Sequence, residues 1–222
     1  MAPTLNAASE SWTDGKKEAA PYASPNSLAH IVLRTTPDKY QEMIDFYVRL
    51  LKATISCQGP VITFLRYDYE HHRIAIVSAP EVVRDQEGAV RAGLDHVSFA
   101  YKTLTDLART YVGLRSLEDP ILPVWTVNHG PTTSLYYRDP DRNKIELQVD
   151  NFDRPEDANE FMGGQYYESN PIGSDFDVDE WAKYILEKAK PDGSEGLTEV
   201  EKKTLKKRIE VGDRRQLPEV YF

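Results

Sequence analysis

An internal repeat limits the possible folds of this chain more than any other feature. LAHIVLRT (residues 28–35) and LDHVSFAY (residues 94–101) share a leucine, a histidine two residues later, a β-branched residue and then a large apolar residue. Each stretch has the apolar, β-branched character of a buried strand. A histidine at the same place in two such strands indicates a repeated structural unit, with one histidine from each copy available for a shared site.

The segments that follow the two strands repeat as well. Apolar residues at helical spacing predict one helix within residues 35–53 and another over residues 103–117. Each predicted helix is followed by three short strand-like runs. They are ATISCQ, VITFLRY and HRIAIVSAP in the first copy, and ILPVWTV, TTSLYYRD and NKIELQV in the second. The order is βαβββ twice, which predicts an α+β domain over residues 28–150, built from tandem units at 28–80 and 94–150.

The two ends of the chain differ from the repeated units in composition and in hydrophobic pattern. Residues 1–27 are rich in Ala, Ser, Pro and charge and have no clear period, which predicts a mobile arm or a loosely docked strap. Residues 151–222 contain short helical patterns interrupted by Gly and Pro, and a highly charged stretch that predicts one helix near 197–210. We interpret 151–222 as a C-terminal extension that wraps the paired units.

Charge and composition exclude several classes of function. A formal charge of −9 argues against a nucleic-acid groove, which needs clustered Lys and Arg. No stretch approaches 18 consecutive apolar residues, so no membrane span is expected. The N-terminal segment lacks the apolar core of a signal peptide, and a single cysteine is typical of a reducing compartment. We therefore expect a cytoplasmic protein.

Three residues of the repeat form a candidate metal site. His30 and His96 lie on the first strands of the two units, and Glu146 lies on the last strand of the second. Ile145 and Leu147 flank Glu146, so its carboxylate points to the opposite face of that strand. Burial of a lone carboxylate is costly, and a divalent cation beside it removes most of that cost. Two histidines and one carboxylate are the ligands of the facial triad of non-haem Fe(II) oxygenases.

The quoted segments also resemble a known family. LAHIVLR, FLRYDYEHHRIAIV, LDHVSF and NHGPTTSLYYRDPDRNKIELQV together resemble the vicinal oxygen chelate superfamily, within it the extradiol ring-cleaving dioxygenases of the catechol and 2,3-dihydroxybiphenyl type. The resemblance covers residues 28 to about 150. NPIGSDFD (170–177) is similar to the tail of the small, one-domain members.

The resemblance implies roles for individual residues. It implies Fe(II), with Mn(II) as the alternative metal, held by His30, His96 and Glu146. His72, from the HHR run, would act as the proton donor while the O–O bond is cleaved. Tyr136 would hydrogen-bond the substrate, and His129 would lie near it, although His129 is about two residues out of register. The implied partners are a small aromatic diol and O₂, and a homodimer is a further possibility.

Other activities on the same scaffold remain open. Glyoxalase I resembles this chain in its paired units but uses four metal ligands, and aligning HRIAIV with NKIELQ sets Ala75 opposite Glu146, so the fourth ligand is missing. A metal-dependent isomerase, lyase or biosynthetic cyclase is nevertheless an alternative. A metal-free protein that binds a small molecule between the units is the third candidate, and it would need none of the three ligands.

Overall fold

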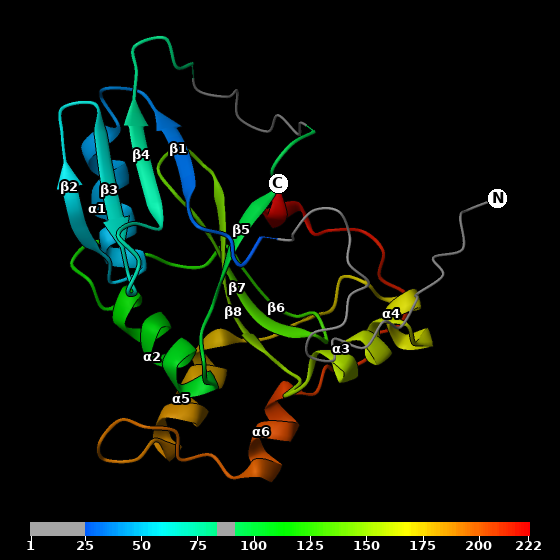
Figure 1. Ribbon diagram of the computed structural model, residues 1–222. Coiled ribbons are helices and arrows are strands. Elements are labelled where there is room, and N and C mark those ends of the chain that lie inside the picture. The colour runs from blue at the N-terminus through cyan, green and yellow to red at the C-terminus, as the bar shows by residue number, and fades with distance from the viewer. Residues whose placement is uncertain (1–24, 84–91) are drawn as a thin grey trace.

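The first unit forms a four-stranded sheet covered by one helix. The computed structural model describes residues 25–83 and 92–222, and within them the first unit follows the predicted order (Figure 1). Its elements are β1 (Ile31–Thr35), α1 (Tyr40–Leu50), β2 (Thr54–Gln58), β3 (Ile62–Arg66) and β4 (Ile74–Ser78). The strand order is β1-β4-β3-β2, with β1 parallel to β4 and the other pairs antiparallel.

The second unit repeats this topology. Its elements are β5 (His96–Ala100), α2 (Leu104–Arg115), β6 (Trp125–Asn128), β7 (Thr132–Arg138) and β8 (Lys144–Asp150). The sheet order is β5-β8-β7-β6, extended at the β6 edge by the short strand β9 (Ser174–Asp175). The prediction of two tandem βαβββ units in an α+β fold is confirmed.

The strand register shows which residues are equivalent in the two units. In the first unit Val32 pairs with Ala75, and in the second Ser98 pairs with Glu146. The repeated histidine lies two residues before Val32 in one copy and two residues before Ser98 in the other. Ala75 therefore occupies the position in the first unit that Glu146 occupies in the second.

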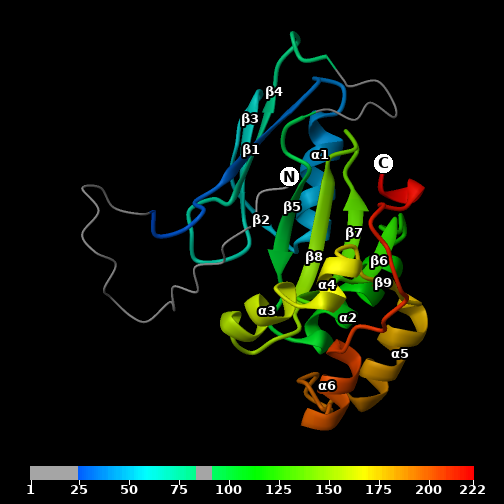
Figure 2. The ribbon, with the colours of Figure 1, turned by 90° about the vertical axis from the view of Figure 1, so that its right-hand side faces the viewer.

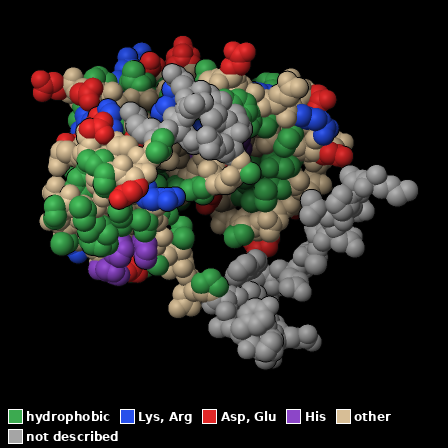
Figure 3. Space-filling model, turned by 90° about the horizontal axis from the view of Figure 1, so that it is seen from above, with side chains coloured by type: hydrophobic (Ala, Val, Ile, Leu, Met, Phe, Trp, Pro, Cys, Tyr) green, Lys and Arg blue, Asp and Glu red, His purple; other side chains and the backbone are tan. Residues whose placement is uncertain are grey.

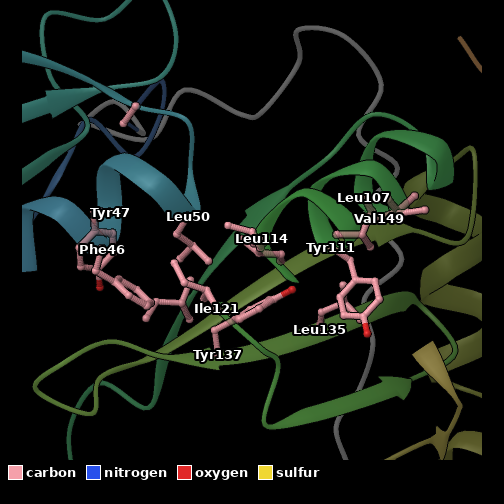
Figure 4. Close-up of a cluster of buried hydrophobic side chains, with 14 of the residues drawn as sticks. Phe46, Tyr47, Leu50, Leu107, Tyr111, Leu114, Ile121, Leu135, Tyr137 and Val149 are labelled. Atoms are coloured by element: carbon pink, nitrogen blue, oxygen red, sulfur yellow. The ribbon is translucent and has the colours of Figure 1, made fainter. Parts of the chain in front are cut away.

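One hydrophobic core joins the two units. Side chains from α1, α2 and the inner faces of both sheets belong to a single buried cluster, part of which Figure 4 shows around Tyr47, Leu114 and Tyr137. Complete burial of one such aliphatic or aromatic side chain stabilises the fold by about 1.5–3 kcal/mol. The Tyr47 hydroxyl also donates a hydrogen bond of 3.0 Å to Asp139 Oδ2, which ties α1 to the β7–β8 turn.

The C-terminal residues cover the second unit. Their elements are α3 (Pro155–Met162), α4 (Gln165–Ser169), β9, α5 (Val178–Lys188), α6 (Glu199–Lys206) and the 3₁₀ helix η1 (Glu219–Tyr221). Helix α5 packs on α2, and α6 is the charged helix expected near 197–210, closed by a capping box of Thr198 and Glu201. Figure 1 shows the last segment, in red, running from α6 past α4 toward β5, and in Figure 2 the same segment ends on the side of the sheet where β6 and β7 are labelled.

Two further sequence predictions concern the N-terminal segment and membrane-spanning helices. The predicted N-terminal arm, residues 1–27, lies almost entirely outside the described residues. Within the described ranges, none of the helices is both long and apolar enough to cross a membrane.

Candidate metal and substrate site

A row of polar and aromatic side chains crosses the second sheet on the face away from the main core. Ser98 pairs with Glu146, Glu146 with Tyr136, and Tyr136 with Trp125, so the row spans β5, β8, β7 and β6. Because side chains alternate along a strand, Ile145 and Leu147 enter the core while Glu146 faces the other way. The alternation predicted from the KIELQV run thus places a carboxylate beside an aromatic cluster.

Glu146 is a buried carboxylate held in its ionised form. It is 4% exposed, and its Oε2 lies 3.1 Å from His96 Nε2. Burial by itself would raise the pKa of Glu146, but hydrogen bonds with His96, Ser134 and Ser98 outweigh burial and lower it to about 2. The group is therefore a fixed negative charge at neutral pH.

The imidazole of His96 lies between two carboxylates. Its Nδ1 is 2.8 Å from Asp95 Oδ1 and its Nε2 faces Glu146. A neutral ring carries one N–H, so it can satisfy only one of these two acceptors. A positive charge at this point, either a proton on the ring or a cation between Nε2 and Glu146, would let both ring nitrogens interact favourably with the two carboxylates. Hydrogen bonding to Glu146 accordingly raises the pKa of His96.

The His96–Glu146 pair supplies two donor atoms that suit a divalent metal. An imidazole nitrogen and a carboxylate oxygen suit Fe(II) and Mn(II). A metal-bound histidine commonly donates its other N–H to a carboxylate, and Asp95 is placed to accept it. His96 and Glu146 therefore have the chemistry and the surroundings of two metal ligands.

His129 and Tyr136 form a second pair next to the first. His129 Nδ1 lies 2.5 Å from the Ile172 carbonyl oxygen, which can only accept, so the ring N–H is on Nδ1. Nε2 is then free to accept from the Tyr136 hydroxyl, 3.0 Å away. Burial lowers the pKa of His129 and raises that of Tyr136. Both groups are uncharged at neutral pH and are aligned by hydrogen bonds.

The C-terminal extension holds the backbone around His129. The guanidinium of Arg208 is buried and donates hydrogen bonds to the carbonyl oxygens of His129, Asn170 and Tyr166. Gly173 brings the chain against β6 at a φ of +109°, where a Cβ would lie 2.3 Å from the Asn128 carbonyl oxygen. This close approach places the Ile172 carbonyl against His129 and explains a glycine in NPIGSDFD.

The histidines of the first unit form a separate cluster. The His30 and His72 rings lie 4.4 Å apart between centroids, and His71 is also 4.4 Å from His72. Histidine side chains gather in one patch on the face seen in Figure 3. The His71 side chain is 81% exposed, whereas His72 also packs against Phe64. Desolvation, together with the charges of His71 and His30, lowers the pKa of His72.

The structure does not bring all three expected metal ligands together. His96 and Glu146 lie side by side, but His30 pairs with His72 instead. Among residues 25–83 and 92–222, no three His, Cys, Asp or Glu side chains are grouped closely enough to hold a metal ion. His30 directly precedes β1 of the first sheet, whereas His96 and Glu146 lie on β5 and β8 of the second.

Several residues of this region were not singled out from the sequence. Asp95, Tyr221 and Arg208 contact His96 or the backbone of His129. Asp95 stands at a variable position of the LDHVSFAY repeat, and the other two belong to no repeated or spaced motif. Asp95 directly precedes His96, and this adjacency is the one local signal that could have marked it. Tyr221 and Arg208 reach the site from the far end of the chain, so no local pattern indicates them.

Comparisons with known proteins found a matching family model and similar proteins. Residues 27–147 match the model of the glyoxalase/bleomycin resistance protein/dioxygenase superfamily. Biphenyl-2,3-diol 1,2-dioxygenase 2 of Rhodococcus globerulus is 40% identical over 150 residues, which are 68% of this chain and 76% of that protein. Biphenyl-2,3-diol 1,2-dioxygenase 3 of the same organism is 41% identical over 149 residues, 67% of this chain and 76% of that protein.

Solved structures were also found at lower identity. A glyoxylase/bleomycin resistance protein/dioxygenase domain from Frankia sp. EAN1pec is 21% identical, with a TM-score of 0.45 over 57% of this chain and 93% of that chain. A putative glyoxalase from Bacillus halodurans is 19% identical, with a TM-score of 0.42 over 56% of this chain and 96% of that chain.

Proposed function

Since this chain belongs to the glyoxalase/bleomycin resistance protein/dioxygenase superfamily, we propose that it is an Fe(II)-dependent extradiol dioxygenase. Its substrate would be a catechol-like diol, with 2,3-dihydroxybiphenyl as the first compound to test because both curated relatives carry that name. The products would be ring-opened and would contain both atoms of O₂. The observation that carries the proposal is the His96–Glu146 pair, a strand histidine facing a buried carboxylate.

His96 and Glu146 are proposed as two of the metal ligands. Asp95 and the serines beside Glu146 would keep the ring and the carboxylate in place. When bound, Fe(II) would supply the Lewis-acid and redox chemistry that a diol and O₂ need.

His30 is proposed as the third ligand. This requires the first unit to approach the second more closely than it does here. Metal binding would favour that arrangement, because a ligand stabilises whichever state it binds more tightly. Mn(II) could use the same nitrogen and oxygen donors.

Tyr136 and His129 are proposed to contact the substrate. The Tyr136 side chain projects from the position opposite Glu146, so a diol beside Glu146 would meet its hydroxyl. The hydroxyl now donates to His129 Nε2, and a substrate oxygen could replace that acceptor. Their aromatic neighbour Trp125, stacked 5.0 Å from Tyr136, suits an aromatic ligand.

His72 is proposed as the residue that moves a proton. Its lowered pKa keeps the imidazole neutral at neutral pH, so it can accept a proton from the diol and return it later in the reaction. Like His30, it would act once the two units approach each other.

A four-ligand glyoxalase-type site is disfavoured by the register of the sheets. Ala75 stands where the fourth ligand would have to be, and an alanine methyl group cannot bind a metal. A three-ligand centre with open positions is the one suited to binding both a diol and O₂.

The test is an oxygen-uptake experiment. The full chain is loaded anaerobically with Fe(II), mixed with catechol, 2,3-dihydroxybiphenyl or larger diols, and then exposed to air. We expect one O₂ consumed per diol, a new visible absorbance from the ring-opened product, and no reaction in His96→Ala. Tight iron binding without uptake from any diol would instead favour an isomerase or cyclase. Failure to bind any metal would favour a small-molecule-binding protein.

A further inference from the structure

The penultimate residue of the chain lies inside the candidate site. Tyr221 is 5% exposed, although it belongs to the terminal helix η1. Its ring packs edge-on against Trp125 and Tyr136, with centroids 5.3 and 5.6 Å away. Because Trp125 and Tyr136 belong to the row on the second sheet, the end of the chain covers the face that carries Glu146.

The hydroxyl of Tyr221 is directed at the residue that holds His96. It donates a hydrogen bond to Asp95 Oδ1 and lies 3.3 Å from His96 Nδ1. The same Asp95 oxygen is 2.8 Å from His96 Nδ1. Lys144 completes the group, since its Nζ is 3.1 Å from Asp95 Oδ2 and 3.3 Å from the centre of the Tyr221 ring.

Asp95 has few other restraints on its position. Its side chain is 55% exposed, and it lies at the start of β5, where the sheet begins. Without fixed partners an exposed aspartate would sample several rotamers and be solvated by water. Tyr221 and Lys144 each bind one of its oxygens, so together they fix the carboxylate in one orientation.

We propose that Tyr221 is a positioning residue for the metal ligand His96, acting through Asp95. With Asp95 fixed, Nδ1–H of His96 has a permanent acceptor, and Nε2 is left to face Glu146 and the metal. A residue that hydrogen-bonds to a metal ligand without touching the metal is called an outer partner here. Outer partners orient a ligating imidazole and make it a stronger ligand. The inference rests on the proposed function, because it assumes a metal between His96 and Glu146. It adds that the last residues of the chain are part of the metal site, although the family model ends at residue 147.

The test compares metal affinity in two tyrosine-to-phenylalanine variants. Tyr221→Phe removes the hydroxyl and keeps the ring that packs on Trp125. The matched control is Tyr111→Phe, because the Tyr111 hydroxyl also donates to an aspartate, Asp179 Oδ1 at 2.6 Å, on the α2–α5 interface. Anaerobic titration calorimetry with Fe(II) and the visible spectrum of the Co(II)-loaded protein report on the metal without relying on activity.

We expect Tyr221→Phe to weaken metal binding roughly 10- to 100-fold and to alter the Co(II) spectrum, as removal of an outer partner typically does. Tyr111→Phe should leave both unchanged. Asp95→Asn should weaken binding similarly, and the double variant Tyr221→Phe/Asp95→Asn should lose little more than either single variant, because the two residues act as one unit.

The possible outcomes separate the two proposals. A wild-type protein that binds no metal would refute the proposed function and the inference with it. A wild-type protein that binds metal, together with a Tyr221→Phe variant of equal affinity and spectrum, would refute the inference alone. Fully additive losses in the double variant would also refute it, since Tyr221 would then not act through Asp95.

Discussion

Glu146 Oε2 lies 3.1 Å from His96 Nε2, although fifty residues separate the two in the chain. Parallel pairing of β5 with β8 creates this contact, because it brings Ser98 opposite Glu146 and His96 two residues away. The contact leaves a buried carboxylate facing a ring nitrogen, and a cation between them would satisfy both.

Removing the charge of Glu146 should abolish metal-dependent activity. Glu146→Gln keeps the shape of the side chain but replaces one carboxylate oxygen by a donor. Since loss of an outer partner alone costs roughly 10- to 100-fold, loss of a ligand should reduce metal affinity and diol cleavage at least about 100-fold. Calorimetry with Fe(II) and oxygen uptake measure the two effects. Glu118→Gln, at an exposed position, is the control and should behave as wild type.

Replacing His72 should slow the reaction without removing the metal. His72→Asn cannot move a proton at neutral pH, and loss of a general acid or base typically costs about 10²- to 10⁴-fold in rate. Glu118→Gln, at an exposed position, is again the control. Turnover with saturating diol is the measurement. Equal rates in the two variants would remove His72 from the reaction.

Arg208 should be important for stability and for the His129 backbone. Arg208→Met leaves the carbonyl oxygens of His129 and Asn170 without their side-chain donor, whereas the Tyr166 carbonyl keeps the Asn170 N–H and the Ser169 hydroxyl. Each buried polar group left unsatisfied costs about 1–3 kcal/mol, so a loss of about 2 kcal/mol or more in the free energy of unfolding is expected for these two groups. In a chain of this size, a loss of that lower amount corresponds to a fall in Tm of roughly 4–8 °C.

The control for that prediction is another arginine of the same extension. Arg215→Met removes an exposed pair with Asp213 and should change the free energy of unfolding by no more than about 0.5 kcal/mol. Hydrogen exchange should show increased opening of residues 166–173 in Arg208→Met but not in Arg215→Met. An Arg208→Met variant as stable as wild type would contradict the anchoring role.

Asp139 should make stability depend on pH. Burial raises its pKa from 3.8 to about 6, even though Asn143 and Tyr47 donate hydrogen bonds to it. A carboxyl whose pKa is higher in the folded state stabilises the fold when protonated, so this contribution is complete below about pH 3.8 and is lost as the pH rises through about 6. The difference corresponds to about 3 kcal/mol.

The measurement for Asp139 is denaturant unfolding of wild type and Asp139→Asn across that pH range. Between acidic and neutral pH, wild type should lose about 3 kcal/mol relative to the variant, because asparagine does not titrate. Parallel curves for the two proteins would show that Asp139 keeps an ordinary pKa in the folded state.

The pattern of strands and helices could be predicted from the sequence because it depends on local periodicity. The paired LAHIVLR and LDHVSFA segments and the helical spacing after each led directly to two βαβββ units. Alternation along KIELQV likewise predicted that Glu146 faces away from Ile145 and Leu147. The pairing of Tyr136 with Glu146 follows from the β7–β8 hairpin, whose turn lies between them.

The candidate site could be predicted only in part. Spacing suggested His96 and Glu146 as partners, and their strands do lie side by side. The expectation that His30 joins them depends on how two separate sheets sit relative to each other, and no local pattern encodes that distance. In the described chain His30 contacts His72 instead, so its role as a ligand stays a prediction.

The sequence by itself determined the repeated units, the face on which each strand residue lies and the charge available for a metal. Only the tertiary structure decided that Asp95, Arg208 and Tyr221 support these residues. Tyr221 is 125 residues from His96, and such a contact forms because burying an aromatic ring and pairing its hydroxyl offset the entropy lost by ordering the chain end. That balance depends on the assembled surface of the second sheet, which short-range sequence patterns do not contain.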